Sequence, residues 1–223
     1  SIRGGSPKTS YYASISYKDQ DGIVKGSNSR NFGGRFNFES MASDKLKFGM
    51  NMDASSRTAN NKDNMISTLI NMRPDYPAYN EDGSINTIDY YTKNPLIEWM
   101  DLNHSTSRNI NASAFLEYNI FKFLKFRTTL NAQYDNVKSE SFSRRSYDGA
   151  NNSGSQRDAQ NYTMVWDNLL TFYKTMRKHD VQAMLGHSVE HVSSDYMSAG
   201  GTDYPDDDIL TNLGSAANRT SMN

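Results

Sequence analysis

The clearest structural signal in the chain is the stretch KLKFGMNMDA, residues 45–54. Leu46, Phe48, Met50, Met52 and Ala54 alternate strictly with polar residues or glycine along it. Successive side chains of a β-strand point to opposite sides of the sheet. A period of two therefore predicts a strand with one apolar face and one polar face.

Six other segments show the same alternation, and in the segment 109–119 one residue, Phe115, breaks it by standing among polar neighbours. The expected strands lie near residues 9–17, 31–40, 45–55, 109–119, 125–137, 161–173 and 180–194. Most are much longer than the 5–6 residues or so that are commonest in soluble sheets. The sequence therefore predicts an all-β protein of about seven long strands.

Short and long connections alternate along the chain. Short links span residues 41–44, 120–124 and 174–179, and long ones span residues 18–30, 56–108, 138–160 and 195–223. In an antiparallel meander this order places all short turns at one end and all long loops at the other, as in bacterial outer-membrane barrels. We therefore interpret residues 1–223 as a partial transmembrane β-barrel with extracellular long loops. A soluble β-sandwich has the same alternation and stays open as an alternative.

Composition excludes some functions and permits a barrel. The net charge of −1 gives no electrostatic basis for binding nucleic acid. No stretch approaches the roughly 20 apolar residues of a membrane-spanning helix, but a barrel strand needs only about 9–11. Aromatic residues stand near the expected strand ends and could form girdles at the two lipid–water boundaries: Tyr11, Tyr17, Phe32, Tyr118, Phe126, Tyr134, Tyr162 and Phe172.

No motif in the chain indicates catalysis. His187 and His191 are four residues apart, which suits a metal on a helix but spans about 13 Å on a strand. The acidic run 206–208 could bind calcium, but its place in an expected polar loop favours a solvated loop. We therefore predict no enzyme activity, no catalytic residue, no metal site and no cofactor.

The long connection 56–108 is the region whose composition most suggests binding. Five aromatic residues stand among its prolines and polar residues: Tyr76, Tyr79, Tyr90, Tyr91 and Trp99. Aromatic side chains in polar loops are typical of contacts with sugars, peptides or partner proteins. We predict these five as substrate- or partner-binding residues. Packing of the loop on itself over the barrel mouth is the alternative.

Several blocks of sequence, in order, resemble the SusC/RagA family of TonB-dependent outer-membrane transporters of Bacteroidetes. The blocks are GGSPKTSYYAS (4–14), YKDQDGIVKGS (17–27), RFNF (35–38), SDKLKFG (43–49), LKFRT (124–128), WDNLLTF (166–172), KHDVQAMLG (178–186) and YPDDDILTNL (204–213). Together they extend over nearly the whole chain.

The resemblance implies a 22-stranded barrel in the cell outer membrane, closed by an N-terminal plug. It further implies import of bulky nutrients, either oligosaccharides or peptides, with a SusD-like surface lipoprotein as lid and TonB as the source of energy. This chain would supply early barrel wall in contact with outer-membrane lipid, together with extracellular loops. We expect the plug and the TonB box to be absent from it. A soluble, secreted glycan-binding β-sandwich and a diffusion porin remain the alternative functions.

Overall fold

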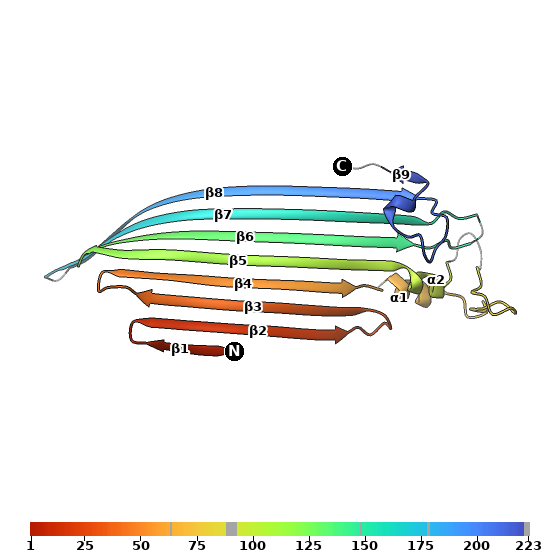
Figure 1. The fold of residues 1–223 in the computed structure, drawn as a ribbon, viewed down its shortest axis with the longest axis horizontal. Helices are drawn as coiled ribbons and strands as arrows, with labels where there is room; N and C mark the ends of the chain where they lie inside the picture. Colours follow the sequence, from red (N-terminus) through yellow and green to blue (C-terminus); the bar gives the residue numbers. More distant parts are fainter. Residues whose placement is uncertain (63, 88–92, 148, 178, 221–223) are drawn as a thin grey trace.

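The computed structural model describes residues 1–220 except 63, 88–92, 148 and 178, and shows one antiparallel sheet in which each strand pairs with the next along the chain (Figure 1). Its strands are β1 (Ile2–Ser6), β2 (Thr9–Asp21), β3 (Asn28–Met41), β4 (Leu46–Asn60), β5 (Leu102–Phe121), β6 (Leu124–Ser143), β7 (Ser153–Met176), β8 (His179–Thr202) and β9 (Asn218–Thr220). Helices α1 (Asn64–Asn71) and α2 (Pro95–Met100) and the short 3₁₀ turn η1 (Leu213–Ser215) lie in the long connections. Neither α-helix of the described chain is long or apolar enough to cross a membrane.

The predicted all-β antiparallel meander is confirmed, and β2 to β8 correspond to the seven expected segments. The structure adds the two short edge strands β1 and β9. It also extends the strands beyond their expected ends, so that β7 and β8 reach 24 residues each. The connections shrink accordingly: 18–30 to 22–27, 56–108 to 61–101, and 138–160 to 144–152. Four short turns lie at one end of the sheet and the long loops at the other (Figure 1).

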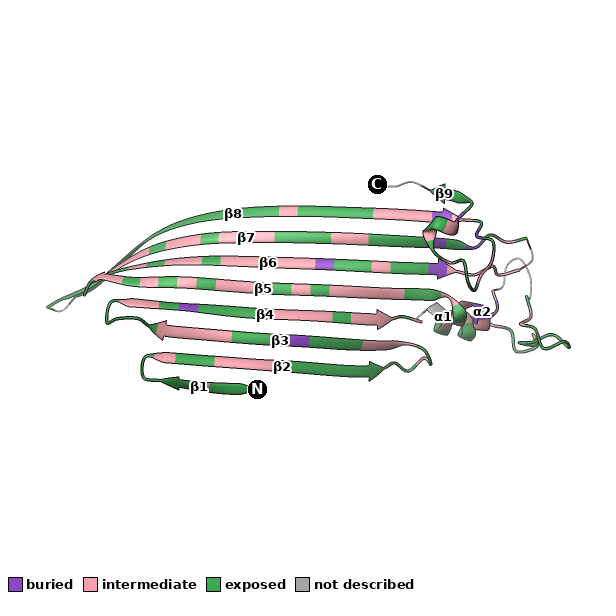
Figure 2. Ribbon diagram, in the orientation of Figure 1, coloured by how far each residue is buried: buried purple, intermediate pink, exposed green. Residues whose placement is uncertain are grey.

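The described chain forms a single layer, so the β-sandwich alternative is wrong. A compact protein of 25.2 kDa should expose about 10,300 Å², yet this chain exposes 15474 Å². Among the described residues, the large or aliphatic side chains that are buried are Pro95, Ile97, Phe142, Tyr204 and Ala216, all near the long-loop end. Along most of the strands, residues are exposed or half-buried (Figure 2). The described part of the chain therefore provides no layer that covers either face of the sheet.

Register places the apolar residues of neighbouring strands on a common face. Met50 pairs with Ala114, Ala114 with Leu130, and Leu130 with Trp166. Phe48 and Leu170 occupy the same face in adjacent rows, because residues two apart on a strand point the same way. We call this side of the sheet the apolar face. The opposite side, the polar face, carries Asn51, Asn131 and Asp167, as the alternation predicts.

The apolar face has the height of a membrane band. In each of four strands, a span of nine residues places mostly apolar side chains on this face, with Thr128 and Asn168 as exceptions. The spans are 46–54 of β4, 110–118 of β5, 126–134 of β6 and 162–170 of β7. This matches the roughly 9–11 residues that a tilted barrel strand needs. Beyond the band, towards the long loops, the same face turns polar at Arg108, Asn136 and Gln160. The extra strand length therefore lies outside the apolar band.

Candidate functional site: the polar face and the long loops

The polar face carries rows of amide and hydroxyl side chains that cross the strands. One row runs Asn37, Asn51, Ser113 and Asn131, and the next runs Arg35, Asp53, Asn111, Gln133 and Thr163. These residues line a hollow of about 330 Å³ in the sheet surface. Side chains of this kind offer both donors and acceptors, so the face suits contact with water or with hydroxyl- and amide-rich ligands.

Hydrogen bonds hold these polar side chains in place. Asp53 pairs with Arg35 across two strands, with 3.1 Å between Oδ2 and Nη2. Asp135 accepts bonds from the amides of Asn109 and, at 2.7 Å, Gln133. Asp167 accepts a bond of 2.6 Å from the hydroxyl of Ser188. These separate contacts join β3 to β4, β5 to β6 and β7 to β8, and each carboxylate orients the donors that it binds.

Phe115, the exception in the alternation, has a defined place on the polar face. Its ring covers Gly49 on the neighbouring strand, where an added Cβ would lie 2.6 Å from the ring carbon Cε1. The guanidinium carbon of Arg127 stands 4.3 Å from the ring centroid, and Glu117 lies beside Arg127. The aromatic ring is therefore accommodated by glycine on one side and by a cation on the other.

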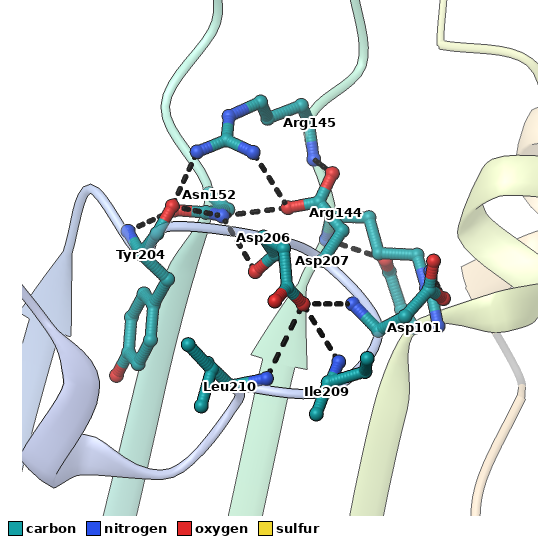
Figure 3. A network of polar contacts seen from close by, with 10 residues as sticks. Asp101, Arg144, Arg145, Asn152, Tyr204, Asp206, Asp207, Ile209 and Leu210 are labelled. Carbon is teal, nitrogen blue, oxygen red and sulfur yellow. Dashed lines mark hydrogen bonds and ion pairs between the residues drawn. The ribbon is translucent and has the colours of Figure 1, made fainter.

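Asn152 and Tyr204 join two of the long loops (Figure 3). The backbone N–H of Tyr204 donates to Asn152 Oδ1 at 2.6 Å, and Asn152 Nδ2 donates to Asp207 Oδ1 at 2.6 Å and to the carbonyl of Tyr204 at 3.2 Å. Asn152 is fully buried. One side chain therefore satisfies several polar groups that the loop closure removes from water.

The acidic run 206–208 forms ion pairs and backbone hydrogen bonds, although the Asp208 side chain is still 76% exposed. Asp207 pairs with Arg145 at 3.3 Å, and Asp208 pairs with Arg144 at 2.5 Å. Asp206 accepts bonds from the N–H groups of residues 208, 209 and 210 at 2.8, 2.7 and 3.2 Å (Figure 3). These N–H donors hold the pKa of the Asp206 carboxyl below its ordinary value.

Asp101, at the end of α2, ties the third long loop to this cluster. Its Oδ1 accepts a bond of 2.8 Å from the backbone N–H of Arg144, and its Oδ2 pairs with Lys93 at 2.5 Å. Lys62 also donates to the Asp101 carbonyl. Connections 61–101, 144–152 and 203–217 are thus linked in one polar network, which we call the loop network.

Tyr204 also anchors its loop by packing. Its ring meets Phe142 edge-on, with 5.1 Å between centroids, and is fully buried. Gly154 and Gly201 leave room for it, since a Cβ on Gly154 would lie 2.5 Å from the Tyr204 hydroxyl oxygen. Among the described residues that hydroxyl has no hydrogen-bond partner, and burial raises its pKa.

The structure separates the aromatic residues predicted to bind. Trp99 on α2 is half-buried, and its indole N–H donates to the carbonyl of Lys25 in another loop at 2.6 Å. The ring of Tyr76 lies 4.8 Å below the guanidinium of Arg73. Tyr79 is 55% exposed and pairs with Ile85 in a small hairpin. The predicted Tyr90 and Tyr91 lie outside the described residues.

Asn94 organises that loop and has no distinctive signal in the sequence. It caps α2, accepting a bond of 3.0 Å from the N–H of Leu96, and its amide donates to the carbonyls of Ala78 and Asn86 at 2.9 Å each. The sequence Asn94-Pro95 does fit a helix start, because Asn at the cap and Pro at the first position are both favoured. Its long-range partners could not be read from that motif.

A cleft of about 340 Å³ lies where the helices meet the strand ends. Its walls include Lys62, Glu98 and Asp101 on one side and small residues of β6 to β8, among them Ser141, Ser155 and Gly200, on the other. The cleft is therefore a second polar surface, at the long-loop end of the sheet.

Comparison with known proteins places this sheet in context. The chain is 31% identical over 216 residues to TonB-dependent receptor P26 of Formosa agariphila, a match that spans 89% of this chain and 21% of the relative. TonB-dependent receptor P3 of the same organism is 23% identical over 92% of the chain and 22% of its own length. The chain thus spans about a fifth of the length of these curated relatives. No family model matches it.

Solved structures show the same fold. The RagAB peptide transporter superposes with a TM-score of 0.76 and 22% identity, over 99% of this chain and 28% of the matched one. The RagAB peptide importer in its open-open state gives a TM-score of 0.77 with 21% identity, over 99% and 27%. The 31% identity over 89% of the chain shows that the chain belongs to the TonB-dependent receptors, and its fold is that of a segment of the RagA-like β-barrel.

Proposed function

We propose that the chain forms outer-membrane barrel wall and extracellular loops in a protein that imports bulky nutrients with energy supplied through TonB. The observation that carries this proposal is the single sheet with an exposed apolar band of nine residues on one face and ordered amide rows on the other. Lipid would cover the apolar band, since no layer of the described chain does. The polar face would line the lumen.

Oligosaccharides or peptides are the proposed substrates. Both present many hydroxyl or amide groups, which match the donors and acceptors of the Asn37 and Arg35 rows. The peptide transporter and importer among the structural neighbours support peptides as the substrate class. The alternative of a diffusion porin predicts passage that needs no TonB.

A SusD-like surface lipoprotein is the proposed lid over the long loops. The loop network joins three loops into one platform, which a partner could contact without first ordering each loop. Tyr76, Tyr79 and Trp99 lie in the same loop region and remain the proposed contact residues, with Tyr90 and Tyr91. Trp99 would act through the position of its loop, because its indole N–H already binds Lys25.

Uptake by the intact receptor tests the proposal. The full-length gene is deleted and restored in cells with and without TonB, and uptake of fluorescent oligosaccharides and peptides is measured. We expect uptake of one substrate class only when both the receptor and TonB are present. Equal uptake without TonB would favour the porin, and a receptor recovered in the soluble fraction would contradict the membrane wall. Co-purification of a lipoprotein with the receptor, lost on deletion of residues 74–86, would support the lid.

A further inference from the structure

The short-turn end of the sheet carries a rim of exposed cations. Each of the four short turns contributes one described basic residue: Lys8, Lys45, Lys122 and Arg177. Lys174, near the end of β7, adds a fifth. All five are exposed, and the carboxylates nearest in sequence to these turns are Asp44 and Asp180. This end of the sheet is therefore net positive.

Other cations near the same end of the sheet are paired with carboxylates. On the polar face, Lys47 pairs with Glu39 at 2.8 Å, and Lys125 pairs with Glu117 at 3.0 Å. Within the described part of the chain, no ion pair forms at Lys122 or at the other four rim cations. Lys47 and Lys125 are thus neutralised by carboxylates, whereas the described cations of the rim form no ion pair.

Aromatic rings accompany the rim on the apolar face. Phe121 and Phe123 stack with 5.4 Å between centroids, and Phe123 meets Phe172 edge-on at 5.7 Å. The ammonium of Lys174 lies 5.9 Å from the centroid of Phe123. Phe121 and Phe123 are 57% and 42% exposed. This group, with Lys122 between the two rings in sequence, is the aromatic–lysine cluster.

The cluster has the chemistry of a membrane interface. Aromatic rings favour the level of lipid headgroups, and lysines there extend their stems along apolar surface and hold the charge in the polar layer. Zwitterionic headgroups would leave the excess of cations unbalanced. We propose that the rim, through Lys122 and Lys174 of the aromatic–lysine cluster, binds anionic phospholipid headgroups at the membrane surface that meets the short turns. This inference rests on the proposed membrane-spanning wall and adds a lipid partner to it.

The test uses the full-length receptor in detergent, to which phosphatidylglycerol or phosphatidylcholine is added while bound lipids are counted by native mass spectrometry. We expect tighter binding of phosphatidylglycerol. Since each lysine near an anionic surface contributes about fivefold in affinity, the K122Q/K174Q variant should lose roughly 30-fold for phosphatidylglycerol. Its affinity for phosphatidylcholine should not change.

The matched control is K47Q/K125Q, which removes two lysines near the same end from the opposite face. It should bind phosphatidylglycerol like the unmodified receptor. Equal losses in the two variants, or equal affinity of the unmodified receptor for both lipids, would overturn the proposal. Displacement of phosphatidylglycerol by millimolar inorganic phosphate would also overturn it, by indicating a site for free phosphate. Recovery of each variant from the outer-membrane fraction separates this outcome from failure of the membrane wall itself.

Discussion

At the scale of single residues, Tyr204 shows how a loop is fixed to the sheet by one aromatic ring. The ring fills the space beside Gly154, while its backbone joins Asn152. Its hydroxyl is buried without a partner among the described residues. A buried hydroxyl without a bond costs about 1–3 kcal/mol. Packing of the ring must therefore outweigh that loss.

Substitution of Tyr204 separates the two contributions. In the full-length receptor, Y204F should stabilise the loop by about 1 kcal/mol or leave it unchanged, because only the unsatisfied hydroxyl is removed. Y204A should destabilise it by about 3 kcal/mol through the cavity it leaves. The rate of limited proteolysis within residues 144–152 measures both effects. Clear destabilisation by Y204F would show that the hydroxyl has a partner in the assembled barrel.

The hydrogen bonds of Asp206 should make the stability of its loop depend on pH in the acid range. Its pKa is lowered in the folded loop by the N–H groups of residues 208–210. A lowered folded-state pKa gives stability that is complete above the unfolded value of about 3.9 and is lost as pH falls through the folded one. Protection of the Ile209 and Leu210 amides from hydrogen exchange, corrected for intrinsic rate, should therefore hold at pH 6 and decline below about pH 4. In D206N this decline should be absent, and an unchanged decline would assign it to another group.

At the scale of strands, alternation identified every long element but missed its full length. Inside the apolar band, lipid would require apolar side chains on one face, so the period of two is strong. Beyond the band, Arg108 and Gln160 replace apolar residues on the same face of β5 and β7. Hydrogen bonding to the neighbouring strand continues there without that requirement. The pattern therefore fades before the strand ends.

Neighbouring residues on β6 test the assignment of the two faces. Leu130→Lys should impair folding of the receptor in lipid by about 2–4 kcal/mol, because it places a charge in the centre of the apolar band. Asn131→Lys, on the polar face, should cost far less. Urea unfolding in lipid vesicles measures the free energies, and recovery in the outer-membrane fraction provides a second readout. Similar losses in both variants would contradict the assignment.

At the scale of the whole molecule, the large exposed area determines whether the isolated chain stays dispersed in solution. The chain exposes 15474 Å², about half as much again as the 10,300 Å² or so of a compact protein of this mass. Its two edge regions also present strand backbone that is free to pair with other strands. An open sheet of this kind needs further strands to pair with its edges and lipid to cover its exposed apolar surface.

The isolated 223-residue chain should consequently aggregate in plain buffer and stay dispersed only in detergent. Size-exclusion chromatography with light scattering, with and without detergent, measures this directly. Addition of detergent after aggregation controls for simple misfolding during expression. A folded, soluble monomer in plain buffer would contradict the interpretation of the chain as barrel wall.

The sequence alone determined the sheet, its meander order and the segregation of short turns from long loops, because period-two alternation and connection length are local properties. It also indicated the family through blocks spread over the chain. Only the tertiary structure decided what the loops do. The acidic run 206–208, which the sequence predicts as a solvated loop, stays partly exposed but also binds Arg144, Arg145 and backbone N–H groups. Those partners are some 60 residues away along the chain or are backbone atoms oriented by the fold, and no local pattern encodes such meetings.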